Sequence, residues 1–231
     1  MNKRKVAVFV EGQAEYVFVR DFLCRWYDYD STLLGIECFS LRSDLYNSEP
    51  YPFGDRKSVN YYQIVNVGND RSVLSKMLKE APRLQNAGFH QIIGLSDMYS
   101  DLYHVQTKER CIDVAVNQKL IDECQNSLNA SSQRDLLSYH FAIMEVEAWI
   151  LGMYQFLQQI DSSLTPQFIM SRLQIDITAD PEISFYHPAK VLDEIYRLAG
   201  RQYGKHLNEL SPFACIRSLQ IIQRIYKRPC C

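Results

Sequence analysis

Two hydrophobic patterns alternate along residues 1–160 of this chain. Short runs of β-branched and aromatic residues without polar alternation are typical of strands buried on both faces. They cover residues 6–10, 61–67, 91–95 and 139–144. The segments between the runs carry apolar residues at helical intervals and predict helices. These segments cover residues 14–27, 70–87, 108–128 and 145–151.

This order of elements predicts an α/β fold. Parallel neighbouring strands need crossover connections, so strands that alternate with helices favour a mostly parallel sheet flanked by helices on both faces. The strand of residues 6–10 is expected at the centre of the sheet. Residues 28–58 are rich in Asp, Ser, Tyr and Pro, and their one apolar stretch, at 33–39, is compatible with a strand or with an irregular segment.

Caps and prolines indicate where helices begin and end. Asn69 or Asp70 is expected to cap the second helix, and Pro82 is expected to bend or shorten it. Beyond residue 165 the pattern is helical throughout. Three prolines there stand where helices are able to begin: Pro166, Pro188 and Pro212.

The formal net charge of −2 over 231 residues is unevenly distributed. From His187 to the end, eight basic and three acidic residues give +5, which leaves −7 for the rest. Together with the helical pattern beyond residue 165, this distribution favours an α/β core at residues 1–160 and a helical, basic C-terminal extension at residues 161–231 that packs on the core. A basic end beside an acidic body suits a polyanionic ligand. The alternative is that these charges only solvate the outer faces of helices.

Signals for export and membrane insertion are weak. A basic start precedes an apolar run, as in a signal peptide, but Glu11 ends the run before the usual length of about 7–15 residues. No stretch approaches the roughly 18 apolar residues that span a bilayer. Seven cysteines, an odd number without C-x-x-C spacing, favour reduced thiols. We expect a cytoplasmic protein without a membrane partner.

Acidic residues stand where three predicted strands end. They are Glu11 and Glu15 after the first strand, Asp97 and Asp101 after the third, and Glu145 and Glu147 after the last. Ligands of open α/β sheets gather at the carboxyl ends of strands, so these side chains are expected to converge. Clustered carboxylates repel one another unless a cation or protons compensate. Mg²⁺, or Mn²⁺ in its place, prefers hard oxygen ligands and leaves positions for phosphate, so the pattern favours phosphate chemistry.

Each acidic residue also has a structural interpretation. Glu15 is suited to the first turn of a helix, where the macrodipole favours a negative charge. Asp97 is suited to a cap or a turn. Glu145 and Glu147 would point the same way on a strand but about 200° apart on a helix, and we favour Glu147 as the ligand.

Four motifs in sequence order carry a resemblance to a known family. They are E-G-Q-A-E at residues 11–15, D-M-Y at 97–99, M-E-V-E-A-W at 144–149 and P-A-K-V-L at 188–192. The chain resembles the Toprim fold of topoisomerases, primases and related nucleases. It is most similar to the Toprim-related domain-of-unknown-function family 4276, with motifs like E-G-Q-T-E, D-Y-Y, H-E-F-E-A-L and P-x-K-x-L. The resemblance covers nearly the whole chain.

The resemblance implies roles for individual residues. In Toprim proteins, a glutamate after the first strand and aspartates after a later strand bind magnesium, which polarises a phosphoryl oxygen and activates a water. The implied metal ligands are Glu11, Asp97 and Glu147, with Asp101 and Glu145 as further candidates and Glu15 assisting directly or through water. Lys190 is implied to neutralise the scissile phosphate, although an exposed lysine at a helix start is the alternative. Tyr99 is expected to stack on a base, or else to be a packing residue.

Three positions depart from the family pattern. Ala14 replaces the usual threonine or glutamate, Met98 interrupts paired tyrosines, and Met144 stands where the family often has histidine. None of these changes removes a carboxylate. The metal site therefore survives, but a histidine at position 144 is not available as a general acid.

The sequence leads to one main functional hypothesis and two rivals. The main one is a Mg²⁺-dependent nuclease or phosphodiesterase acting on DNA or RNA, in a prokaryotic defence system with a separate ABC-type ATPase, as the resemblance implies. The rivals are a non-catalytic binding subunit and an enzyme that transfers phosphate on small molecules. No Walker loop, nucleophile elbow or dinucleotide fingerprint occurs, which disfavours autonomous ATP hydrolysis and α/β-hydrolase chemistry.

Overall fold

The sheet is the centre of the architecture. In the computed structural model, which describes residues 3–42, 44–68, 72–107 and 111–203, six strands pair in the order β3-β2-β4-β1-β5-β6. The strands are β1 Arg4–Val10, β2 Leu34–Arg42, β3 Leu45–Ser48, β4 Asn60–Asn66, β5 Gln91–Asp97 and β6 Leu137–Ala142. Neighbours are parallel except for the antiparallel pair β2 and β3. As expected, β1 lies inside the sheet, between β4 and β5.

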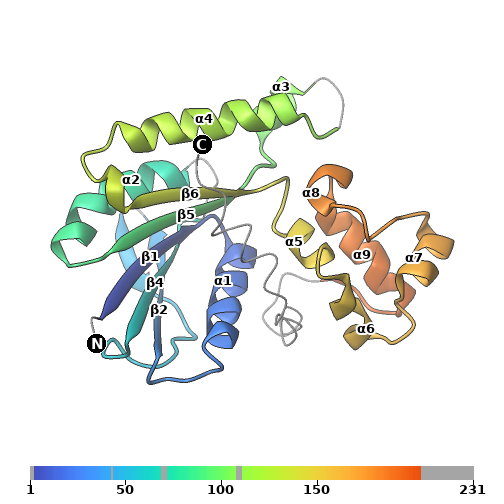
Figure 1. Cartoon of the computed structure of the whole chain (residues 1–231), viewed down its shortest axis with the longest axis horizontal. Helices are drawn as coiled ribbons and strands as arrows, with labels where there is room; N and C mark the ends of the chain where they lie inside the picture. Colours follow the sequence, from blue (N-terminus) through green and yellow to red (C-terminus); the bar gives the residue numbers. More distant parts are fainter. Residues whose placement is uncertain (1–2, 43, 69–71, 108–110, 204–231) are drawn as a thin grey trace.

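Helices cover both faces of the sheet (Figure 1). They are α1 Gln13–Trp26, α2 Val73–Asn86, α3 Asp101–Gln106, α4 Val114–Asn129, α5 Glu147–Leu151, α6 Leu157–Ile160, α7 Pro166–Leu173, α8 Pro181–Ser184 and α9 Pro188–Leu198, with 3₁₀ turns at Arg134–Leu136 and Tyr154–Phe156. The predicted fold class is therefore confirmed: an α/β protein with a mostly parallel sheet flanked by helices and a helical C-terminal region.

Strand β1 shows why its sequence lacks polar alternation. Val6, Val8 and Val10 pack into one hydrophobic core together with α1, whereas Ala7 and Phe9 pack into a second core with α2. Successive side chains of a strand point to opposite faces, and both faces are covered here. All five side chains are consequently buried.

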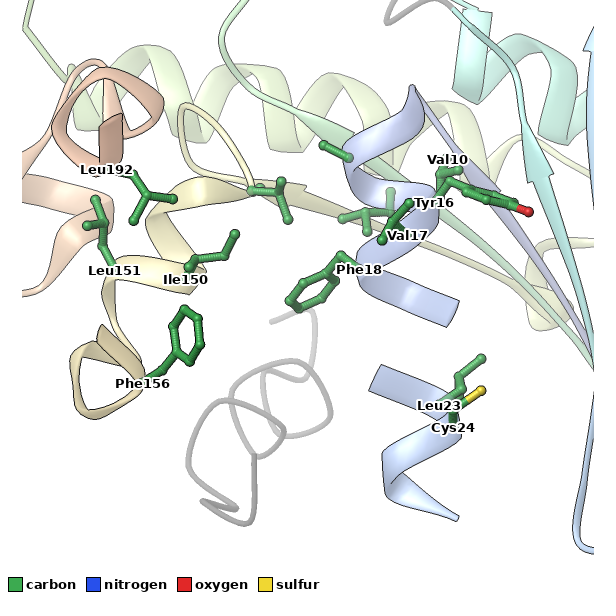
Figure 2. Close-up of a cluster of buried hydrophobic side chains, with 14 of the residues drawn as sticks. Val10, Tyr16, Val17, Phe18, Leu23, Cys24, Ile150, Leu151, Phe156 and Leu192 are labelled. Carbon is green, nitrogen blue, oxygen red and sulfur yellow. The ribbon is translucent and has the colours of Figure 1, made fainter. Parts of the chain in front are cut away.

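The helices α5 to α9 gather beyond α1 and the carboxyl end of β6 (Figure 1). Apolar side chains of α5, α6, α7 and α9 belong to the same core as α1 and β1. Figure 2 shows Phe18 of α1 directed toward Ile150 of α5, with Leu151 and Leu192 beside them. The described part of the C-terminal region thus shares a core with the sheet, while the boundary at residue 160 remains a prediction.

Several local predictions differ from the structure. Helix α2 begins only at Val73, after Ser72, and continues past Pro82 to Asn86, so Pro82 does not end it. Of the two alternatives for the segment at 33–39, the strand is the observed one, and it runs from Leu34 to Arg42. Strand β6 ends at Ala142 rather than at residue 144. The predicted caps Asn69 and Asp70 lie outside the described residues.

Prolines mark helix starts as expected, with one addition. Pro166 and Pro188 occupy the first positions of α7 and α9, and Pro181 does the same for α8, which the sequence pattern did not single out. Pro212 lies outside the described residues, as do five of the eight C-terminal basic residues, Lys205, Arg217, Arg224, Lys227 and Arg228. No helix in the described ranges is long and apolar enough to cross a bilayer.

Candidate functional site

The carboxyl ends of β1 and β5 bring Glu11 and Asp97 together. The two strands are parallel neighbours, so their ends lie at the same edge of the sheet. Glu11 directly follows β1, and its Oε2 accepts a hydrogen bond of 3.0 Å from the backbone N–H of Asp97, the last residue of β5. Two residues 86 positions apart therefore meet at one point.

The turn after β6 is linked to this edge by two hydrogen bonds, one to a side chain and one to the backbone. We call residues 143–146 the β6 turn. The backbone N–H of Val146 donates to Oδ1 of Asp97 over 2.9 Å, and the N–H of Tyr99 donates to the carbonyl of Met144 over 2.8 Å. The Asp97 carboxylate consequently links β5 to the segment that carries Glu145 and Glu147.

Met144 gives the β6 turn its shape. Its φ of 66° lies in the left-handed region, where a non-glycine residue stores roughly 1–2 kcal/mol of strain. The side chain is fully buried against Met98 and Tyr103, and this packing holds the strained backbone in place. Position 144 is thus a packing position.

Glu145 in the β6 turn and Glu147 at the start of α5 form hydrogen bonds with different partners. Glu145 is half-buried, and its Oε2 accepts a bond of 3.0 Å from the N–H of Ala189 in the first turn of α9. Glu147 is fully buried, and its Oε1 accepts a bond of 3.0 Å from the Tyr203 hydroxyl. Burial, and next the adjacent Glu147 carboxylate, raise the pKa of Tyr203 well above its usual range.

The remaining sequence candidates lie around this edge. Glu15 is buried, and its Oε2 accepts a bond of 2.9 Å from the N–H of Gly12, which fits the helix-start interpretation. Asp101 is exposed in the first turn of α3, where Ser100 provides the cap. Lys190 is exposed on α9, directly after Ala189.

The ring of Tyr99 lies within a group of aromatic rings. Its centroid is 4.7 Å from that of His104, 5.2 Å from that of His187 and 5.8 Å from that of Tyr186. The hydroxyl of Tyr186 also forms a 2.8 Å hydrogen bond with Nδ1 of His104. These contacts fit the interpretation of Tyr99 as a packing residue, and its stacking on a base remains a prediction.

The acidic residues do not form a closed metal cage. Among the described residues, no three or more His, Cys, Asp or Glu side chains are grouped so that they could hold a metal ion. Mg²⁺ usually needs only one or two protein carboxylates, since waters and substrate phosphates supply its other ligands. Glu11, whose carboxylate contacts the backbone of Asp97, and Asp97 itself offer two hard-oxygen carboxylates at this edge, which fits that requirement.

One residue at this edge, Glu182, was not evident in the sequence. Oε1 of Glu182, in α8, accepts bonds from the indole Nε1 of Trp149 over 2.8 Å and from the N–H of Ile143 over 3.3 Å. Asp180 followed by Pro181 marks a helix start in the sequence. That signal places Glu182 in a first turn, but the contact with Ile143 depends on tertiary packing.

Replacing Glu145 with alanine is expected to lower the free energy of unfolding by about 1 kcal/mol, because the first turn of α9 loses an acceptor and a favourable negative charge. Chemical denaturation measures the change. The control is Glu194→Ala, since Glu194 is exposed on the same helix. Equal midpoints for both variants and the wild type would show that the Glu145 contact contributes nothing to stability.

Comparisons with protein-family models, with curated proteins and with solved structures found no match for this chain.

Proposed function

We propose that this chain is a Toprim-like, Mg²⁺-dependent phosphodiesterase that cleaves nucleic acid. The proposal is supported above all by the contact between Glu11 and Asp97 at adjacent parallel strand ends. It is further supported by the Toprim-like order of acidic motifs. The same resemblance suggests a prokaryotic defence system and a separate ABC-type ATPase as partner.

In this proposal, Glu11 and Asp97 hold Mg²⁺, or Mn²⁺ in its place. When bound, such an ion supplies Lewis acidity toward a phosphoryl oxygen and lowers the pKa of a water. The hydrogen bonds Asp97 N–H to Glu11 and Val146 N–H to Asp97 orient the two carboxylates before a substrate arrives. Lys190 would neutralise phosphate charge from the exposed face of α9.

The partners of Glu145 and Glu147 refine their proposed roles. Glu145 accepts a hydrogen bond from the first turn of α9, so its proposed role is to hold the helix that carries Lys190. Glu147 is bonded to Tyr203 inside the core, so its use as a metal ligand requires that this buried contact rearrange. We therefore propose Glu11 and Asp97 as the ligands that bind first.

One observation favours a second candidate function. The carboxylates of Glu145 and Glu147 accept hydrogen bonds from Ala189 and Tyr203, which suits a subunit in which these acidic residues support the fold and not catalysis. Such a subunit would bind nucleic acid or a protein of an ATPase-associated complex. Its nucleic-acid affinity would fall steeply with salt.

The test offers labelled DNA and RNA to the full chain with Mg²⁺ or Mn²⁺, and measures Mn²⁺ binding by calorimetry in parallel. Cleavage that requires the metal supports the phosphodiesterase. Salt-sensitive nucleic-acid binding without cleavage supports the binding subunit. Metal binding without any affinity for polynucleotides would instead indicate phosphate transfer on small molecules.

A further inference from the structure

The carboxylate of Glu182 lies between two segments near the proposed metal site. One of its oxygens, Oε1, accepts the indole N–H of Trp149 at 2.8 Å and the backbone N–H of Ile143 at 3.3 Å. Ile143 is the first residue of the β6 turn, and Trp149 lies in α5 directly after that turn. Glu182 therefore forms hydrogen bonds with residues before and after Val146.

The β6 turn is also hydrogen-bonded to Asp97 and Tyr99 at the end of β5. Val146 donates its N–H to Oδ1 of Asp97, and the carbonyl of Met144 accepts the N–H of Tyr99. The turn cannot relax freely between these bonds, because Met144 is fixed in a left-handed conformation by its buried side chain. A displacement at Ile143 is consequently transmitted to the N–H that orients the Asp97 carboxylate.

Glu182 is itself firmly placed. Its backbone N–H donates to Oδ1 of Asp180 over 3.1 Å at the start of α8, and the preceding Pro181 is buried. Trp149, its stronger partner, also packs on Phe18 of α1 with ring centroids 5.4 Å apart. Helix α1 begins two residues after Glu11. Through Trp149 and Phe18, Glu182 is therefore also connected to the helix that follows Glu11.

We propose that Glu182 is a positioning residue for the carboxylate site. It acts by accepting the N–H groups of Ile143 and Trp149, which fixes the β6 turn and thereby the orientation of Asp97. The inference rests on the proposed function, since it assumes that Asp97 binds a divalent ion. What matters is the position of an acceptor oxygen, because both contacts are hydrogen bonds donated by neutral groups.

The experiment compares three substitutions of Glu182 in the full chain. Glu182→Gln keeps the acceptor oxygen and removes the charge, Glu182→Asp keeps the charge but is one methylene shorter, and Glu182→Ala removes the acceptor. The chain has two tryptophans, Trp26 and Trp149. All variants also carry Trp26→Phe, so that the fluorescence comes from Trp149 alone. The matched control is Glu194→Ala on the exposed face of α9.

Two readouts are measured: the Mn²⁺ dissociation constant by calorimetry and the emission spectrum of Trp149. Loss of an outer partner of a metal ligand typically weakens metal binding 10- to 100-fold, and Glu182 acts one step further out. We expect about tenfold weaker Mn²⁺ binding and shifted emission for Glu182→Ala, and about threefold weaker binding for Glu182→Asp. Glu182→Gln and Glu194→Ala are expected to stay within about twofold of the wild type, since neither removes an acceptor from the β6 turn.

Two results would overturn the inference in distinguishable ways. If Glu182→Ala and Glu182→Asp bind Mn²⁺ like the wild type, Glu182 is only structural, whatever the emission of Trp149 does, and the proposed function stands. If the wild type binds no Mn²⁺, the proposed function fails and the role of Glu182 fails with it. Should Glu182→Ala not fold, the comparison of Glu182→Asp with Glu182→Gln decides, because each keeps what the other loses.

Discussion

Asp97→Asn is expected to remove metal-dependent cleavage while the fold remains. Asparagine keeps an oxygen at Oδ1, which is able to accept the N–H of Val146 as Asp97 does over 2.9 Å. What it loses is the negative charge that would hold the ion. Metal ions supply several kcal/mol of transition-state stabilisation, so the rate should fall at least about a hundredfold. The measurements are initial cleavage rates and the Mn²⁺ dissociation constant.

Asp97→Ala separates the two roles of the carboxylate. Alanine removes both the charge and the acceptor, and leaving the Val146 N–H unsatisfied costs about 1–3 kcal/mol of stability. Both variants should therefore be inactive, but only Asp97→Ala should show a lower denaturation midpoint. Asp135→Asn is the control, because the Asp135 side chain is 95% exposed beside the start of β6. Wild-type cleavage by Asp97→Asn would exclude Asp97 from the site.

The meeting of Glu11 and Asp97 could be predicted from the sequence. Uninterrupted apolar runs before both residues indicate parallel strands buried on both faces, and parallel strands end at the same edge. The pairing of β1 with β5 confirms that arrangement of the strands. The role of the two carboxylates in metal binding is a separate question and remains a proposal.

The separate paths of Glu145 and Glu147 could not be predicted in the same way. They depend on the left-handed φ of Met144, which propensity alone disfavours, and on the packing of α9 and Tyr203 against the turn. Both are tertiary effects. A local pattern gives the spacing of two carboxylates but not the partners that distant segments offer them.

Short elements were missed for a related reason. Strand β3 is mostly exposed and owes its conformation to antiparallel pairing with β2, not to an apolar pattern. Helix α3 has only six residues, and its local signal is the cap in which Ser100 accepts the N–H of Tyr103. Elements of this length bury too little apolar surface to show a period.

Gly94→Ala is expected to cause the largest loss of stability among the substitutions considered. Gly94 is opposite Tyr139 on the neighbouring strand β6, and a Cβ at position 94 would lie 2.3 Å from Cδ2 of the Tyr139 ring and 3.1 Å from Sδ of Met77. The ring has little freedom to move away, because the Tyr139 hydroxyl is bonded to Ser96 at 2.9 Å. Overpacking of this kind costs about 3 kcal/mol.

Chemical denaturation of Gly94→Ala, with Gly152→Ala as control, measures this cost. A Cβ at Gly152 would meet nothing closer than 3.5 Å, and its φ of −62° suits alanine, so Gly152→Ala should be neutral or slightly stabilising. Removing the ring should relieve the clash: in a Tyr139→Ala background, Gly94→Ala should cost clearly less, which a double-mutant cycle quantifies. An equal cost in both backgrounds would mean that Gly94 is required by the backbone of β5. Position 94 and Asp97 lie on the same strand, β5. If the folded Gly94→Ala variant has a distorted β5, it should therefore also bind Mn²⁺ more weakly than the wild type.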